Sequence, residues 1–438
     1  MNTLFHDYTR SRYEKNKKIF SFQYVASPAT LFEYAGSCEG LENVPPIADS
    51  AIGKLVMEVF SFDKYDATHP YAFRKKTPSA RSIHPFLPVI HYHGFLFLYD
   101  ANCSDFIYFG YNPARQDTIE LVICADLWRI CSVYGEFGIP LSLLELGHLL
   151  SDMKWFMNDD GCLELENGSF PFLPYHCLAG SGSMLNANDL YAMSLLKITE
   201  LDDCIEGYTN PSYPIGIKKK YNYLEELHAL GIDHFFAQAK KGEIRFPKPY
   251  HQKISDLPLK RRQRHSLNKR QGTFHLGPVL RTGVFKSFLS QMNIYTKEWL
   301  SANVTIYFFI YHIEGIPRGV YQWEGADINF LHANIDIYSI FYEAQEFMNL
   351  DTLPFLTLIT VKDEENQSLS SFIESHIHAG EIVHTMSLLY AGEDTFTRPF
   401  KNINDAYCQK VCQTKENEYF IYGCLFGFGE KRNGLRWR

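Results

Sequence analysis

The sequence lacks the features that mark secreted, membrane and nucleic-acid-binding proteins. Its ten cysteines form no C-x-x-C pair, so neither a disulfide framework nor a zinc ribbon is expected. No apolar run approaches the roughly 18–20 residues that cross a bilayer, and the polar start MNTLFHDYTR contains no signal-peptide core. The formal net charge of −8 disfavours nucleic acid, which needs a broad basic surface. We therefore expect a cytoplasmic protein that binds neither membranes nor nucleic acids.

A metal centre is not expected either. Cys408 and Cys412 lie four positions apart and could form half of a metal site on one helix face. Buried thiols that pack as small hydrophobic side chains are commoner. The chain has 438 residues, of which 46% are hydrophobic and 15% aromatic. That length exceeds what one hydrophobic core normally serves, so two globular domains are expected.

The most basic stretch of this acidic chain lies between Lys248 and Arg270 and contains KRRQRHSLNKR. A charge run is usually a solvated face. Here Arg264 and Ser266 place a planar fork of donors beside a short hydroxyl, and Lys269 and Arg270 follow within about one helical turn. Such donors match a phosphate or the pyrimidine edge of a flavin.

A proline-serine turn and a tyrosine form the second group of candidates. Pro78 fixes φ and can set a rigid corner from which Ser79 points at a ligand, although an ordinary turn is the alternative. Tyr134 precedes His148 by 14 positions (148 − 134). Tyr134 is a candidate base or else an interface aromatic, whereas His148 is expected to pack between helices.

Hydrophobic periodicity predicts similar elements in the two halves of the chain. Helices are expected at 51–60, 143–156 and 221–240, and the strands are expected at 88–92, 95–100, 118–124, 189–198, 306–313, 319–330, 357–361 and 419–427. Tyr99-Asp100 and Phe106 match Trp323-Glu324 and Phe330 at an offset of 224 (330 − 106). Ala379-Gly380 to His384 loosely mirrors Leu146-Gly147-His148. Two copies of a long pattern indicate a duplication.

These motifs resemble those of known flavoproteins. Arg264-His265-Ser266 followed by a basic residue resembles the FMN-binding opening of the nitroreductase family, in which the partner subunit supplies a Pro-Ser motif. Pro78-Ser79-Ala80, the hairpin after it and the spacing from Tyr134 to His148 are similar to SagB-type azoline dehydrogenases, a branch of that family. Two positions depart from that branch: Arg81 replaces a glycine, and Val133 replaces the catalytic lysine.

The resemblance implies an α+β fold of two fused nitroreductase-like domains, with antiparallel or mixed sheets flanked by helices, in an intramolecular pseudo-dimer. It implies an N-terminal arm at 1–45, a first domain at 46–200, a helical linker at 201–260 and a second domain at 261–438. Tyr134 would be catalytic, with Arg81 replacing the lysine as the nearby cation, and the cofactor would be FMN. The FMN-binding candidates are Arg264, His265, Ser266, Lys269, Arg270, Pro78, Ser79, Ala80, Arg81, Lys431 and Arg432.

Three functions follow as alternatives. The first is an FMN-dependent dehydrogenase that oxidises thiazolines or oxazolines to azoles in a ribosomally made peptide. It would act beside a cyclodehydratase, either as a pseudo-dimeric monomer or in a larger assembly. The second is another flavin oxidoreductase of the same fold that uses NAD(P)H. The third is a catalytically silent scaffold in a peptide-modifying complex, which Val133 favours.

Overall fold

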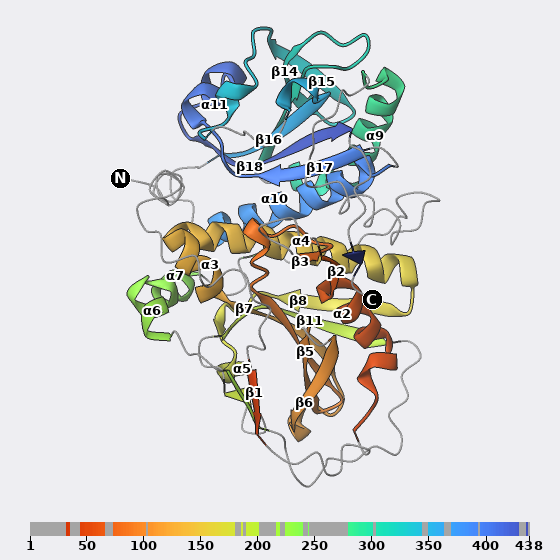
Figure 1. Cartoon of the computed structure of the whole chain (residues 1–438), viewed down its shortest axis with the longest axis vertical. Helices are drawn as coiled ribbons and strands as arrows, with labels where there is room; N and C mark the ends of the chain where they lie inside the picture. The colour runs from red at the N-terminus through yellow and green to blue at the C-terminus, as the bar shows by residue number, and fades with distance from the viewer. Residues whose placement is uncertain are drawn as a thin grey trace. The chain divides into compact units, whose positions relative to one another are not determined.

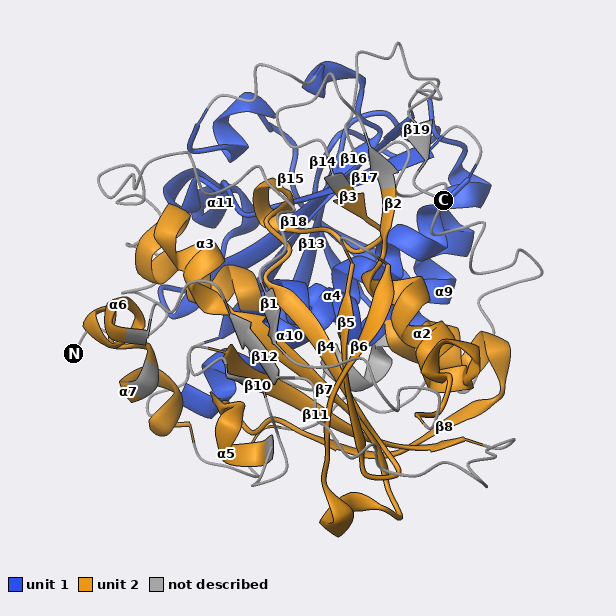
Figure 2. Ribbon diagram, turned by 60° about the horizontal axis from the view of Figure 1, so that its bottom comes forward, with its two compact units in different colours: residues 1–13, 143–152, 252–434 blue, residues 14–142, 153–251, 435–438 orange. Residues whose placement is uncertain are grey.

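The structure is a computed structural model of the whole chain (Figure 1). It describes residues 32–35, 44–65, 73–101, 104–179, 185–186, 190–200, 216–219, 224–239, 244, 279–300, 304–343, 349–362, 369–392, 395–428 and 435–436. The chain divides into two compact units, coloured separately in Figure 2. Unit 1 comprises 1–13, 143–152 and 252–434, and unit 2 comprises 14–142, 153–251 and 435–438. The domain boundaries expected from the sequence stay a prediction.

Unit 2 is built around an antiparallel sheet in the order β6-β5-β4-β7-β11-β8, with β9 beside β11. Its strands are β4 (Phe86–Tyr92), β5 (Phe95–Asp100), β6 (Asp105–Tyr111), β7 (Ile119–Asp126), β8 (Leu163–Ser169), β9 (Leu173–Pro174) and β11 (Leu190–Glu200). The central strands β4, β5 and β7 are buried along their whole length, which explains their nearly continuous apolar runs.

Unit 1 contains a second antiparallel sheet, in the order β15-β14-β13-β16-β18-β17. Its strands are β13 (Val304–Ile310), β14 (Gly319–Glu324), β15 (Asp327–His332), β16 (Phe355–Lys362), β17 (Thr395–Phe400) and β18 (Glu418–Phe428). The two sheets have the same strand order when β4 is matched with β13 and β7 with β16. The predicted duplication is therefore present in the topology.

The first hairpin of each sheet shows how closely the copies agree. A register shift falls between Leu96 and Phe97 in one copy and between Val320 and Tyr321 in the other, at the same offset of 224 (320 − 96). The predicted match of Phe106 with Phe330 is wrong. Tyr99 pairs with Phe106, whereas Trp323 pairs with Ile328. The hairpin turn of the second copy is two residues shorter, so Ile328 takes the place of Phe106.

Helices surround each sheet. Unit 2 contains α2 (Ala51–Phe60), α3 (Leu127–Tyr134), α5 (His176–Ala179), α6 (Leu224–Ala229) and α7 (Ile232–Ala237), and unit 1 contains α9 (Thr282–Leu300), α10 (Leu369–Tyr390) and α11 (Asp405–Cys412). The predicted bounds of α2 are confirmed. The helix expected at 221–240 is two short helices, interrupted at Gly231, which has a φ of 71°. The long helix α4 (Gly138–Asp160) contributes residues 143–152 to unit 1 and its ends to unit 2.

The start of α2 depends on two capping groups. The Ser50 side chain accepts a hydrogen bond from the Gly53 amide at 3.0 Å. The carboxylate of Glu200, at the end of β11, accepts from the amides of Ala51 and Ile52. An acidic group at a helix N-terminus satisfies unpaired amides and interacts favourably with the helix dipole. Glu200 thereby ties the last strand of the unit 2 sheet to its first long helix.

The sheet of unit 1 has a core on both faces. Tyr307, Leu358 and Leu425 face α11, whose Cys408 and Cys412 are buried in the same cluster. These two thiols therefore pack as core side chains, as the sequence favoured. On the opposite face, Phe355 and Phe426 stack on each other. Phe285 and Phe288 of α9 and Tyr390 of α10 meet them edge-on. The layers are thus helix, sheet and helices. The expected α+β class, with antiparallel sheets flanked by helices, is confirmed.

Two small sheets complete the described structure. One has the order β1-β12-β10, formed by β1 (Phe32–Ala35), β12 (Gly216–Lys219) and β10 (Leu185–Asn186). The other has the order β19-β2-β3, formed by β19 (Leu435–Arg436), β2 (Phe62–Tyr65) and β3 (Phe73–Lys75). β19 pairs antiparallel with β2, so the end of the chain joins the sheet from which the Pro78 turn emerges.

Within unit 1, α4 and α10 cross at two glycines. A Cβ on Gly147 would lie 2.0 Å from the carbonyl oxygen of Ile377, three residues before Gly380. A Cβ on Gly380 would lie 2.1 Å from the carbonyl oxygen of Leu144, three residues before Gly147. The contacts are reciprocal, so a local two-fold axis relates the two helices at their crossing. The predicted correspondence between Gly147 and Gly380 is confirmed.

No helix in the part of the chain that the structure describes is long and apolar enough to cross a membrane.

Candidate functional site

The Pro-Ser motif forms a tight turn after β3. Ser79 is extended, and Ala80–Ser82 form a 3-10 helix. The amides of Ser82 and Ile83 donate to the carbonyls of Ser79 and Ala80, both at 3.1 Å. The His84 amide donates to the Ser79 hydroxyl at 2.9 Å. The serine hydroxyl therefore fixes the turn as an acceptor, while its own hydrogen can point at a ligand.

Arg81 occupies an unusual backbone conformation in this turn, with φ 51° and ψ 24°. Ser82 and His84 also have positive φ values, 55° and 48°. This left-handed region favours glycine, and each other residue there costs roughly 1–2 kcal/mol. Glycine, which the SagB-type pattern has at this position, would adopt this conformation without strain. An arginine held there at a conformational cost is a candidate for a functional role.

Tyr134 is the last residue of α3. The helix ends there because Gly135 takes φ 59° and ψ −143°, a conformation that strongly favours glycine. The Tyr134 ring is half-buried and meets Phe137 edge-on, with ring centroids 6.3 Å apart. Val133, where the SagB-type pattern has lysine, supplies no cation beside it.

The two predicted motifs meet within unit 2. The guanidinium carbon of Arg81 lies over the Tyr134 ring, 5.3 Å from its centroid, which is within the range of a cation–π interaction. Arg129, on the same helix as Tyr134, donates to the His84 carbonyl at 3.2 Å. Turn and helix are therefore held together at two points. Pro78, Ser79, Ala80 and Arg81 are all half-buried, so a ligand can reach this surface.

The lysines that precede the turn have structural roles. Lys75 lies over the rings of Phe60 and Phe62, at 5.9 and 5.3 Å from their centroids. Lys76 forms an ion pair with Glu58 and donates to that residue's carbonyl at 3.1 Å. Both lysines are buried. They anchor the turn to α2, and Arg81 is the basic residue of this segment that lies at Tyr134.

The predicted phosphate-binding residues lie outside the described residues. These residues are Arg264, His265, Ser266, Lys269, Arg270, Lys431 and Arg432. Leu435 and Arg436, shortly after Lys431 and Arg432, form β19 beside β2. β2 pairs with β3, which leads directly into the Pro78 turn. The chain on one side of Lys431 and Arg432 is thus anchored to the small sheet that carries the turn.

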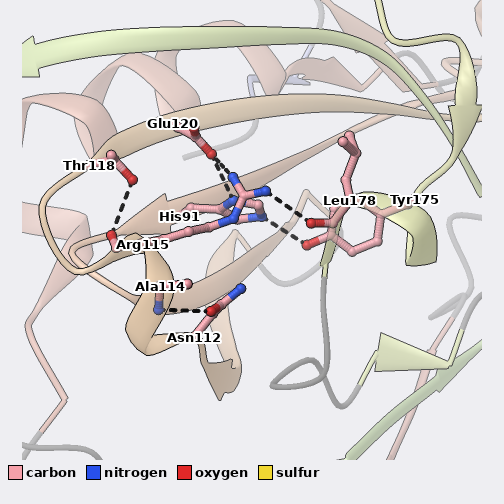
Figure 3. A network of polar contacts seen from close by, with 8 residues as sticks. All are labelled: His91, Asn112, Ala114, Arg115, Thr118, Glu120, Tyr175 and Leu178. Atoms are coloured by element: carbon pink, nitrogen blue, oxygen red, sulfur yellow. Dashed lines mark hydrogen bonds and ion pairs between the residues drawn. The ribbon is translucent and has the colours of Figure 1, made fainter.

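A second polar cluster in unit 2 was not expected from the sequence. His91 on β4 lies directly opposite Glu120 on β7, and Figure 3 shows Arg115 reaching the same carboxylate. His91 Nδ1 lies 3.2 Å from Glu120, and the Tyr175 hydroxyl donates to Nε2 at 3.0 Å. Burial, and then the charge of Arg115, lower the pKa of His91 to about 3. The ring is therefore neutral.

This second cluster is structural. His91 and Tyr175 are 0% and 1% exposed, and Arg115 also donates to the Leu178 carbonyl at 3.0 Å. A substrate cannot reach either ring. The polar residue in the otherwise apolar strand FLPVIHY was the available signal. Among the residues that the structure describes, no group of three or more His, Cys, Asp or Glu side chains is arranged to hold a metal ion.

Comparison with known proteins identifies the fold. A solved structure described as a nitroreductase, from Anabaena variabilis, matches with a TM-score of 0.64 and 12% identity. The match covers 96% of this chain and 99% of that one. The chain has a nitroreductase-like fold. At this identity the likeness shows the fold alone. No protein-family model and no curated protein matches the sequence.

Two further solved structures match less well. A nitroreductase described from Ralstonia eutropha has a TM-score of 0.32 and 17% identity, over 43% of this chain and 90% of that one. The McbBCD microcin synthetase complex of E. coli, solved with a truncated pro-peptide, has a TM-score of 0.31 and 11% identity. That match covers 35% of this chain and 66% of the other. Scores this low carry no conclusion about this chain.

The turn from Pro78 to Arg81 offers groups that suit a flavin ring. The edge of an isoalloxazine accepts hydrogen bonds, and Arg81 and Ser79 are donors of the matching kind. Thr77 is 1% exposed, and its hydroxyl has no hydrogen-bond partner among the described residues. A buried hydroxyl without a partner costs roughly 1–3 kcal/mol. These donors fit the ring of FMN.

Proposed function

We propose that this chain is an FMN-dependent dehydrogenase that oxidises thiazoline or oxazoline rings to azoles in a ribosomally made peptide. The contact of Arg81 with Tyr134 carries the proposal. Tyr134 matches one motif of the SagB-type pattern, and Arg81 lies in the other, where the pattern has glycine. Together the two residues would supply a phenol and a cation beside it. The nitroreductase-like fold agrees with a flavin enzyme of this class.

In the proposed reaction, each described residue has a definite task. The ring hydrogen beside the peptide carbonyl and the imine is acidic, and Tyr134 in its phenolate form is the base that takes it and becomes the neutral phenol. Arg81 holds the phenol ring and places positive charge next to it. The Pro78–Arg81 turn presents donors to the cofactor's ring. FMN, when bound, supplies the hydride acceptor for the neighbouring carbon.

The remaining cofactor contacts are part of the proposal. Arg264, His265, Ser266, Lys269 and Arg270 would bind the phosphate and one edge of the ring, and Lys431 and Arg432 would close on the phosphate from the C-terminal segment. The peptide substrate would come from a cyclodehydratase that forms the azoline in the cytoplasm. Only an enzyme of that class makes the ring that this reaction consumes.

The absorbance spectrum of the purified protein, loaded with FMN, tests the proposal first. We expect flavin bands that stay with the protein on desalting, and azole formation when an azoline peptide is added. Tyr134→Phe should keep the bands and lose azole formation. Tyr111→Phe is the matched control, because Tyr111 is another half-buried tyrosine of unit 2, and it should retain full activity.

Two outcomes would favour the alternatives. Rapid bleaching by NADPH without any peptide would indicate a reductase of the nitroreductase type. Protein that binds no flavin at all would indicate a scaffold, which Val133 at the lysine position favours.

A further inference from the structure

A chain of hydrogen bonds crosses the contact between α4 and α10 inside unit 1. Tyr422 Oη lies 3.0 Å from His148 Nε2. His148 Nδ1 lies 3.4 Å from His384 Nδ1, and His384 Nε2 lies 3.3 Å from Asp152 Oδ1. The two histidines and the aspartate are at most 1% exposed, and Tyr422 is 7% exposed. Four titratable side chains are thus linked away from solvent.

The local two-fold axis shows that this series of hydrogen bonds is specific to one corner of the helix crossing. The Ser151–Thr385 contact, at 3.4 Å, is the two-fold image of the Asp152–His384 contact. The image of the His148–His384 pair is instead Glu381 with Ser151. Identical subunits in a homodimer would repeat every contact at both corners. In a fused, duplicated polypeptide the two copies can differ in sequence. The histidine pair can therefore occur at one corner of the crossing without its two-fold image.

The direction of the hydrogen bonds follows from the donor inventory. When Asp152 is ionised, His384 Nε2–H donates to it, which leaves His384 Nδ1 as an acceptor in the neutral ring. His148 must then carry its hydrogen on Nδ1, and its Nε2 accepts from the Tyr422 hydroxyl. Every bond points toward Asp152, and the four groups together carry one negative charge.

One added proton can be accommodated, and a second cannot. With one proton more, His384 donates from both nitrogens, to Asp152 and to His148 Nδ1. His148 then carries its hydrogen on Nε2 and donates to Tyr422, so every bond remains satisfied. A second proton would put hydrogens on both Nδ1 atoms, which lie 3.4 Å apart. That contact would lose its hydrogen bond and bring two like charges together.

We propose that Tyr422, His148, His384 and Asp152 form a one-proton switch. Uptake of a single proton moves the His148 hydrogen from Nδ1 to Nε2 and reverses the bond to Tyr422. The Tyr422 hydroxyl hydrogen is then released to another acceptor. The switch thereby links proton uptake at the helix crossing to β18, the strand between β16 and β17 that carries Tyr422.

Two further carboxyl groups lie on the same helices, close in sequence to the histidines. Glu145 lies on α4 one turn before His148, and Glu381 lies on α10 one turn before His384. Both carboxyl groups are buried, at 4% and 0% exposure, so they are titratable groups that the proton count in the test must distinguish from the histidine pair. No other titratable groups from α4, α10 or β18 take part in the bonds described. None of these groups belongs to the proposed FMN site, so proton uptake at the helix crossing does not require bound flavin.

The test is a pH titration of the full-length protein, labelled with ¹⁵N-histidine, from about pH 8 to pH 5. Nitrogen shifts report which ring atom carries hydrogen, and the His148→Gln and His384→Gln variants assign the signals. We expect the pair to gain one proton in total, with the His148 hydrogen moving from Nδ1 to Nε2. Asp152→Asn should lower the pH of uptake by at least about one unit, because it removes the charged partner.

Two further variants separate the switch from general effects of mutation. Tyr422→Phe keeps the ring and removes only the acceptor of His148 Nε2–H, so it should also lower the pH of uptake. His376→Gln is the control, since this buried histidine on α10 bonds to its own helix at Phe372 O, 2.8 Å away. It should leave the titration unchanged. Uptake of two protons, a fixed His148 tautomer, or no uptake before acid unfolding would each overturn the proposal.

Discussion

The guanidinium of Arg81 covers the ring of Tyr134, with 5.3 Å between its central carbon and the ring centroid. The SagB-type pattern has glycine at the first position and lysine just before the second. Here the positive charge comes from the turn instead of the helix. The left-handed backbone of Arg81 directs its side chain toward α3. Compared with that pattern, the cation beside the tyrosine would come from a different position of the sequence.

Substitutions at Arg81 should separate backbone strain from charge. Arg81→Gly should leave the free energy of unfolding within about 1 kcal/mol, because glycine adopts φ 51° without strain. Arg81→Val should cost about 1–2 kcal/mol more, since a β-branched residue is poorly tolerated there. Both should slow azoline oxidation to a similar extent. Urea denaturation checks the first statement, and equal stabilities for the two variants would contradict it.

The predicted phosphate-binding segment should control cofactor retention. Arg264→Ala and Ser266→Ala should each yield protein that loses FMN on desalting, because charge-assisted bonds to phosphate are removed. Arg261→Ala, in the same basic run, is the matched control and should stay yellow. The flavin absorbance per mole of protein is the measurement. Loss of colour in all three variants would indicate a general charge effect.

The glycines of the helix crossing should be intolerant of any side chain. Gly147→Ala and Gly380→Ala place a Cβ about 2 Å from a backbone carbonyl oxygen, so each should destabilise the chain by at least about 1–3 kcal/mol. Gly283→Ala on α9 is the control, since nothing lies within 4 Å of its Cβ. It should be neutral or stabilise by up to about 1 kcal/mol. Thermal unfolding measures the difference, and equal effects at all three positions would refute the crossing.

Acid should weaken the fold through His91. Its pKa is lowered to about 3 in the folded chain, whereas an unfolded histidine titrates near about 6.5. Between these values the unfolded chain binds a proton that the folded chain does not. The free energy of unfolding therefore falls as the pH drops below about 6.5, by about 2 kcal/mol at pH 5 from this residue.

His91→Gln should flatten that pH dependence, although it also lowers stability at pH 7 through the lost contacts. His234→Gln, at an exposed histidine of α7, should leave the slope as it is. Urea denaturation at about pH 7 and about pH 5 gives the two slopes. An unchanged slope in His91→Gln would show that His91 has the same pKa in the folded and the unfolded chain, which contradicts the prediction.

Sequence periodicity was sufficient for the elements that are apolar on one or both faces. The predicted helix at 51–60 and the strands around Ile90, Ile123 and Phe308 are confirmed, because apolar side chains recur along their whole length. Gly147 and Gly380 were matched by comparing the two halves of the sequence, and the reciprocal contacts at the crossing agree with that match. The offset that relates Tyr99 to Trp323 failed at Phe330, because hairpin length is set by turn residues and not by strand pattern.

Less of the candidate site than of the fold could be predicted from the sequence. Pro78 and Tyr134 could be selected from motifs, but their contact through Arg81 depends on a positive φ that no pattern specifies. The buried chain through His148 and His384 depends on the angle at which two helices cross. His91 and Glu120 meet only because β4 pairs with β7 in one particular register. Long-range pairing of this kind has no local signature.

The central claim is that Tyr134 acts as the base beside a bound flavin, and an anaerobic single-turnover experiment tests it most directly. FMN-loaded protein is mixed with an azoline peptide, and flavin bleaching is followed together with the peptide mass. The wild-type protein should bleach as the peptide loses two hydrogens, whereas Tyr134→Phe should keep its colour and leave the peptide unchanged. Bleaching at the wild-type rate in Tyr134→Phe would contradict the account.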